Sequence, residues 1–199
     1  MWRILFSIDT YSVTCALLAL LLLSVIAYGC ERLAPRLVPL PARVLCAVFT
    51  LPVLVATLAP DQPIGSGSRH LWLIPGDALF FSNIPVESME RSMYVLLQVA
   101  NLLMFVPAAV AFRFAWPAYG PWGPVRMGLA LSLFIEAAQW AMAAGRVVDI
   151  DDVIANTTGA ALGALLCLAA GRLTRPLRRP RRRPHRRTPS HRRSRAGIP

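Results

Sequence analysis

Polar residues with helical spacing stand inside otherwise apolar stretches of this chain. Between Ser132 and Trp140, the side chains of Ser132, Glu136 and Gln139 recur at intervals of four and three, which places them on one helical face. In a membrane-spanning segment, an ionisable side chain at mid-depth costs at least about 2.5 kcal/mol, so this face is expected to point into a helix bundle. A carboxylate held there could bind a cation or exchange a proton.

Two other segments carry polar residues in the same way. Gln98 and Asn101 share a face of an earlier apolar run. In a later run, steps of four, three and four align Asp152, Asn156, Gly159 and Gly163. The two glycines form a GxxxG pair, which lets helices approach closely in lipid, so we predict that they pack against a neighbouring helix.

We expect these polar faces to converge at one membrane surface. Arg146 is the only basic residue in the sequence near four carboxylates there, and it is expected to pair with Glu136 or Asp149. The remaining acids would then attract a cation or a ligand ammonium group. The candidate ligand-binding residues are Asn101, Glu136, Gln139, Arg146, Asp149, Asp151, Asp152 and Asn156. The alternative is that these groups hydrogen-bond one another and hold the helices in register.

Metal and nucleophile chemistry have weaker support in the sequence. Carboxylates suit hard cations. However, the segment around Asp151 contains no histidine, and its aspartates do not have the spacing of a calcium-binding loop, so no metal is predicted. Ser132 has no nearby histidine to activate it. The three histidines are in the outer loop and the C-terminal tail: His70, His185 and His191. We therefore predict no catalytic residue and no cofactor, although an acid or base role for Glu136 or Asp152 stays open.

The elements that position these residues are transmembrane helices. Hydrophobic residues make up 56% of the 199-residue chain, which is high for a soluble domain. A helix crosses the hydrocarbon with roughly 20 mostly apolar residues. Five windows qualify: Tyr11–Gly29, Arg43–Ala59, Met93–Phe112, Val125–Ala143 and Val153–Gly171. The predicted fold is an all-α polytopic membrane bundle over residues 1–171.

The net charge of +11 comes from the C-terminal tail. Residues 172–199 hold twelve arginines and no acid, and they lack apolar periodicity, so a disordered cytoplasmic tail is predicted. Such a tail fixes topology and attracts anionic lipids. Without aromatic residues for stacking or a folded module beside it, the tail is not expected to bind nucleic acid.

Arginine also concentrates in alternate connections. The first connection has Arg32, Arg36 and Arg43, whereas the long connection between residues 60 and 92 is acidic. Because arginine-rich short loops stay in the cytoplasm, the second and fourth connections should face outward. This alternation predicts an inner (plasma) membrane protein with its N-terminus outside and its C-terminus inside.

The chain resembles the VanZ-like membrane proteins, which are associated with bacterial resistance to teicoplanin. The resemblance covers residues 71–166, about half of the chain. It is carried by Leu73-Ile74-Pro75, by Asn101 to Pro107, by Ser132 to Gln139 and, most specifically, by Arg146 to Gly159. Trp72, Gly76 and Ala108 depart from the pattern, which usually has asparagine, phenylalanine and glycine at these positions.

The resemblance implies a membrane protein linked to glycopeptide resistance or to maintenance of the cell envelope. Our leading expectation is a non-enzymatic protein with an outward-facing polar pocket for a glycopeptide or a lipid-linked cell-wall precursor. An apolar portion of such an amphiphile would lie between helices, in contact with membrane lipid. A membrane enzyme acting on lipid-linked precursors, and a structural or partner subunit, are the alternatives.

Overall fold

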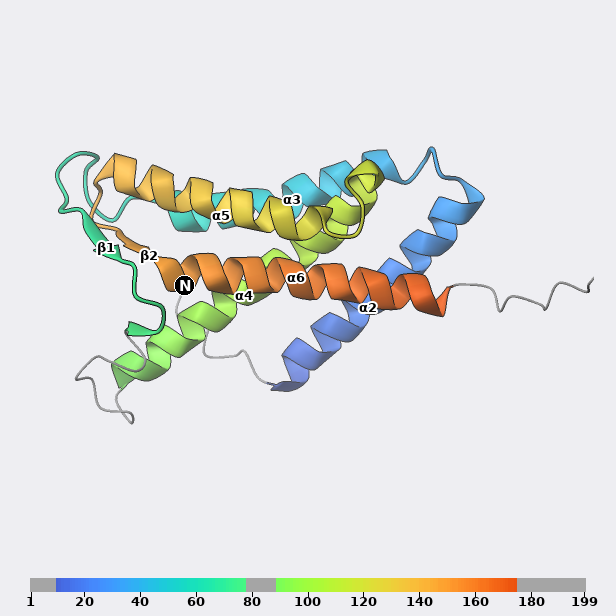
Figure 1. Cartoon of the computed structure of the whole chain (residues 1–199), viewed down its shortest axis with the longest axis horizontal. Coiled ribbons are helices and arrows are strands. Elements are labelled where there is room, and N and C mark those ends of the chain that lie inside the picture. Colours follow the sequence, from blue (N-terminus) through green and yellow to red (C-terminus); the bar gives the residue numbers. More distant parts are fainter. Residues whose placement is uncertain (1–9, 78–88, 175–199) are drawn as a thin grey trace, which may run out of the picture.

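The computed structural model describes residues 10–77 and 89–174, and they form a bundle of long helices. The five helices are α2 (Thr10–Leu33), α3 (Pro39–Leu58), α4 (Met89–Ala115), α5 (Gly123–Met142) and α6 (Ile150–Leu173). Each overlaps one of the five predicted windows almost completely, which confirms the all-α prediction (Figure 1). Within the described ranges, two three-residue strands and the short 3-10 helix η2 (Pro117–Tyr119) complete the regular structure. The predicted disorder of the tail beyond residue 174 lies outside the described residues.

Four of these helices, all except α5, are long and apolar enough to cross a membrane. Helix α5 is as long as α3, at 20 residues, but Arg126, Glu136 and Gln139 lower its mean hydropathy. The last two of these side chains are buried, whereas Leu133 and Phe134 on α5 are exposed. Because Glu136 and Gln139 are buried where α5 packs on the other helices, the exposed surface of this part of α5 is apolar.

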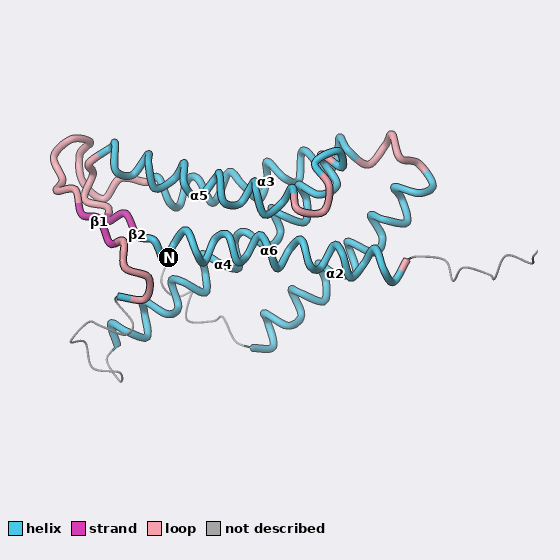
Figure 2. The backbone as a smooth tube through the Cα atoms, viewed as in Figure 1, coloured by secondary structure: helices cyan, strands magenta, loops and turns pink. Residues whose placement is uncertain are grey.

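Strands β1 (His70–Trp72) and β2 (Val147–Asp149) form a parallel pair that the sequence analysis did not predict. His70 is opposite Val147, and Trp72 is opposite Asp149. Backbone hydrogen bonds join the same two connections further along, including Gly67 N–H to the Ala143 carbonyl at 2.7 Å. The second and fourth connections therefore lie together at the end of the bundle where α6 begins (Figure 2).

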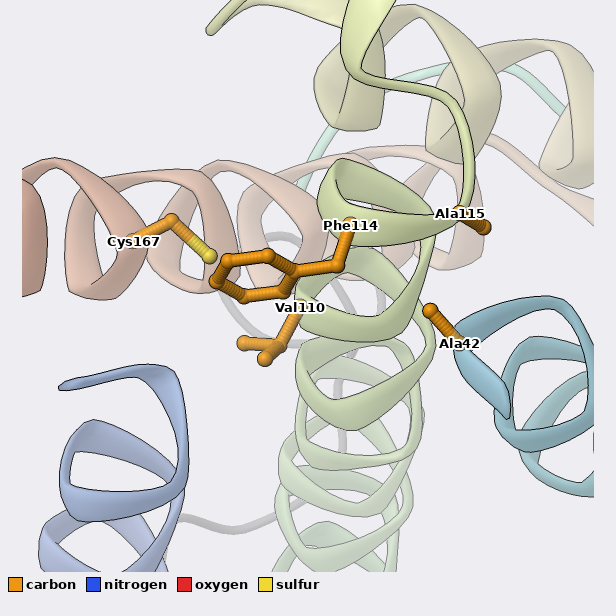
Figure 3. Close-up of a cluster of buried hydrophobic side chains, with 5 residues drawn as sticks. All are labelled: Ala42, Val110, Phe114, Ala115 and Cys167. Carbon is orange, nitrogen blue, oxygen red and sulfur yellow. The ribbon is translucent and has the colours of Figure 1, made fainter. Parts of the chain in front are cut away.

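Helix α4 lies at the centre of the packing, with its main partners α6 and α3 on different sides. At the end opposite the strands, Val110 and Phe114 of α4 point toward Cys167 of α6, while Ala42 of α3 approaches α4 from another side (Figure 3). A second cluster nearer the strands joins Val53, Phe105 and Ile135 from α3, α4 and α5. These two clusters hold α4 in place between its neighbours.

Small residues set the distance between α4 and α6. A Cβ atom on Gly159 would overlap the carbonyl oxygen of Leu102 in α4, and one on Gly163 would stand 2.7 Å from the carbonyl oxygen of Val106. A Cβ atom on Gly128 of α5 would stand 2.3 Å from the Cβ atom of Ala160 on α6. The backbone of α6 can approach its neighbours this closely only because these positions lack side chains. The same approach brings the polar residues of α4 within reach of α6.

Candidate ligand-binding site

Asp152, in the first turn of α6, connects that helix with α4. Its Oδ1 atom accepts hydrogen bonds from Gln98 Nε2 at 2.9 Å and from Asn101 Nδ2 at 2.8 Å. The faces that the sequence placed on two separate helices therefore meet at one carboxylate oxygen. Hydrogen bonds to a charged acceptor are stronger than neutral ones, so this contact should stabilise the α4–α6 pair.

Asp149 precedes α6 and caps its N-terminus. Its side chain accepts a hydrogen bond from the Asp151 backbone N–H at 2.9 Å, and its own backbone N–H donates to Glu136 Oε2 at 3.1 Å. Burial raises the pKa of Asp149 above its usual range, while the hydrogen bonds from Asp151 and from the Tyr94 hydroxyl oppose that rise. The capping position thus ties α5, β2 and α6 together.

Asp151 fixes the outer loop to the start of α6. The Gly76 backbone N–H lies 2.9 Å and 3.0 Å from its two carboxylate oxygens. The Tyr94 hydroxyl stands 2.9 Å from an oxygen of Asp151 and 2.9 Å from an oxygen of Asp149, so one proton serves two carboxylates. The hydroxyl group brings no positive charge, so these hydrogen bonds leave the acidic character of the two carboxyl groups in place.

The predicted pairing of Arg146 with Glu136 or Asp149 is wrong. Arg146 Nε instead lies 3.2 Å from Asp61 Oδ2, and Arg146 Nη2 donates to the Ala59 carbonyl at 3.0 Å. The physical reason is local: the chain just after α3 lies against the connection that contains Arg146, and it offers a carboxylate and a free helix-end carbonyl together. Arg146 therefore forms no ion pair with the four clustered carboxylates Glu136, Asp149, Asp151 and Asp152.

The hydrogen bonds of Gln139 and Asn156 go to other helices and not to the clustered carboxylates. Gln139 Nε2 donates to the Thr57 carbonyl of α3 at 2.9 Å, and Asn156 Nδ2 donates to the Ser132 hydroxyl of α5 at 2.9 Å. Both side chains are buried. Their geometry fits the alternative in which polar groups hold helices in register.

A cavity of about 480 Å³ opens beside the acidic residues, between the starts of α4 and α6. Its lining residues are Pro75, Gly76, Val95, Gln98, Val99, Leu102, Asp151, Ile154, Ala155 and Thr158. Asp151 and Gln98 supply its polar side chains near the strand end. Val95, Val99 and Ile154 are 44%, 38% and 47% exposed, so the apolar part of the cavity opens toward the surroundings of the bundle.

This lining combines a carboxylate with an apolar channel of ligand-pocket size. Such an arrangement can bind a positively charged group at the end of an apolar chain. Among the described residues, no group of three or more histidine, cysteine, aspartate or glutamate side chains is placed to hold a metal ion.

Tyr94 and Gly76 are the site residues that the sequence analysis did not assign. Tyr94 precedes Gln98 by four positions and Asn101 by seven, so helical spacing could have placed it on the same face. Gly76 contributes only its backbone N–H, and a backbone contact cannot be predicted from the residue type. Thr57 likewise contributes only a carbonyl to Gln139.

Apolar helices of membrane-spanning length, packed around a buried polar cluster, define a helix-bundle membrane protein. The family model VanZ/LLP1 matches residues 44–171, which is more than half of the chain, and the protein belongs to this family. The match begins in α3 and ends in α6, so it includes every acidic residue of the site and extends beyond the predicted 71–166 on both sides. Comparison with curated proteins and with solved structures finds no match.

Proposed function

We propose that this VanZ/LLP1 protein binds the cationic part of an amphiphile at its outward-facing acidic site, as a non-enzymatic protein of the inner membrane. The amphiphile would be a glycopeptide of the teicoplanin type or a lipid-linked cell-wall precursor. The observation that carries the proposal is the cavity that joins Asp151 to an apolar channel. The concentration of arginine at the other end of the bundle supports an outward orientation for this one.

The charge of the site favours an ammonium group over a phosphate. Arg146 is already paired with Asp61, so it is not free to bind an anion. Asp151 lies at the cavity wall with Asp149 close behind it, and the two share the Tyr94 hydroxyl. A ligand amine placed beside Asp151 would therefore meet negative charge that Arg146 does not compensate. Glycopeptides and the peptide portions of cell-wall precursors carry such amines.

The apolar walls favour a ligand that is partly embedded in lipid. Val95 and Val99 on α4 and Ile154 on α6 all line the cavity, and all three are partly exposed. An acyl chain or aromatic surface lying along these residues would bury apolar area on both helices. A wholly water-soluble ligand would gain nothing from this part of the cavity.

The direct test is equilibrium binding of a fluorescent teicoplanin-type glycopeptide to the purified protein in phosphatidylcholine nanodiscs. We expect Asp151→Asn to weaken binding about tenfold, which corresponds to the loss of about 1.4 kcal/mol. Glu90→Gln is the matched control, because Glu90 is exposed in the first turn of α4 and does not line the cavity. Acylating the ligand's amines should make the wild type and Asp151→Asn equal. Unchanged affinity for Asp151→Asn would contradict the proposal.

A structural or partner subunit is the second candidate, favoured by the bonds that Asp152 accepts from Gln98 and Asn101. Under that function, the polar residues would matter only through the amount of folded protein. Asp151→Asn should then lower binding and activity only in proportion to the protein level. Normalising both measurements to folded protein separates the two functions.

A further inference from the structure

An apolar groove lies between α2 and α3, at the end of the bundle opposite the acidic site. It has a volume of about 560 Å³, and all of its lining residues are apolar. Cys30 of α2 and Leu45 of α3 form opposite walls, while Val110 and Phe114 of α4 form the floor. The turn between α2 and α3 closes one end of the groove through Leu37. This volume is within the range of sites that bind small ligands.

The groove exists because consecutive helices diverge. Helix α2 packs mainly on α6, whereas α3 packs mainly on α4, and α2 and α3 make at most marginal contact with each other. Figure 3 shows α2 and α3 at different sides of α4. Leu23 on α2 and Leu45 on α3 are 58% and 49% exposed, so no described part of the chain fills the space between them.

The closed end of the groove is strongly basic. At this end of the described bundle, the positive charges outnumber the negative ones: Glu31 is an acid, and the basic residues are Arg32, Arg36, Arg43, Arg113, Arg126 and Arg172. Arg32 donates to the Thr174 carbonyl, and Arg43 donates to the Ala115 carbonyl at 3.4 Å. Arg36 is exposed in the turn and makes no hydrogen bond, ion pair or ring contact with any described residue. An unpaired cation therefore stands one residue from Leu37, which lines the groove.

We propose that this groove binds an anionic phospholipid of the cytoplasmic leaflet. Its acyl chain lies between α2 and α3, and its phosphate meets Arg36. The apolar lining selects a hydrocarbon chain, and the surrounding arginines select a negative headgroup. This site is separate from the acidic site, because the groove is lined by the part of α4 from Pro107 to Phe114, whereas the acidic cavity is lined by the part from Val95 to Leu102.

Native mass spectrometry of the full chain, titrated with dioleoyl phosphatidylglycerol or dioleoyl phosphatidylcholine, tests this site. The two lipids have the same chains and differ in headgroup charge. We expect one phosphatidylglycerol to bind preferentially, and Arg36→Gln to weaken its binding about fivefold, since one arginine near a membrane surface contributes about 1 kcal/mol. Arg69→Gln, which removes the same charge at the strand end, should leave binding unchanged.

A second pair of variants tests the groove itself. Cys30→Trp places a large ring in the groove, whereas Cys15→Trp changes another exposed cysteine of α2 that does not line it. We expect Cys30→Trp alone to reduce lipid binding severalfold. Equal binding of the two lipids, or equal lipid binding by the two tryptophan variants, would overturn the proposal. A fall in the dimer fraction caused by Cys30→Trp, without loss of lipid, would assign the groove to a second copy of the chain and overturn it as well.

Discussion

Gly159→Ala is expected to destabilise the bundle by about 1–3 kcal/mol, the usual cost of inserting a methyl group into a well-packed interior. The added Cβ would overlap the Leu102 carbonyl oxygen, which belongs to the backbone of α4 and cannot rotate away. Helices α4 and α6 would have to separate. Asn101, next to Leu102, would then move away from Asp152, so the substitution should also loosen the acidic site.

The measurement is the free energy of unfolding in mixed micelles of mild detergent and dodecyl sulfate. Gly29→Ala is the matched control, because a Cβ atom there meets nothing within 4 Å. This control substitution should be neutral or slightly stabilising, since alanine is the better helix former. Equal stability of the two variants would show that the close approach of α4 and α6 does not require a glycine at position 159.

Asp152→Ala is expected to cost about 1–3 kcal/mol, because it leaves two partly buried amide donors on α4 without their shared acceptor. Asp152→Asn should recover part of the loss, since its carbonyl oxygen can still accept one or both bonds. The order of stability should therefore be wild type, then Asp152→Asn, then Asp152→Ala. We would measure it by the same unfolding assay, with protein levels in the membrane as a second readout.

A double-mutant cycle identifies the interaction responsible. Asn101→Ala and Asp152→Ala should be less damaging together than the sum of the two single changes, because each removes the same hydrogen bond. Glu90→Ala, an exposed change at the same end of the bundle, should have little effect on unfolding. Strict additivity of Asn101→Ala and Asp152→Ala would contradict the proposed link between α4 and α6.

Much of the fold could be predicted from the sequence, because apolar windows of membrane-spanning length leave few alternatives to helices. The spacing of polar residues at intervals of three and four also predicted the helical faces that carry Gln98, Asn101 and Asp152, and these faces meet in the structure. Strands β1 and β2 could not be predicted, since each has three residues and pairs with a segment far away in the chain. Short segments of this kind carry almost no periodic signal.

The partner of Arg146 was mispredicted for a related reason. Proximity in sequence favoured Asp149, but the choice depends on which connection lies beside Arg146 in space, and that connection contains Asp61. Contacts made by backbone atoms, such as Gly76 N–H to Asp151, are equally invisible in a list of side-chain types. The sequence could therefore indicate which residues gather at this end of the bundle, but not how they pair.

The most direct test of the proposed acidic binding site is teicoplanin susceptibility in a sensitive host that expresses the wild type, Asp151→Asn or Glu90→Gln. Membrane levels should be matched by quantitative blotting. We predict that the wild type and Glu90→Gln protect the cells and that Asp151→Asn does not, because only Asp151 supplies a carboxylate to the cavity wall. Equal protection by all three proteins, or protection by none, would contradict a glycopeptide-binding role for this site.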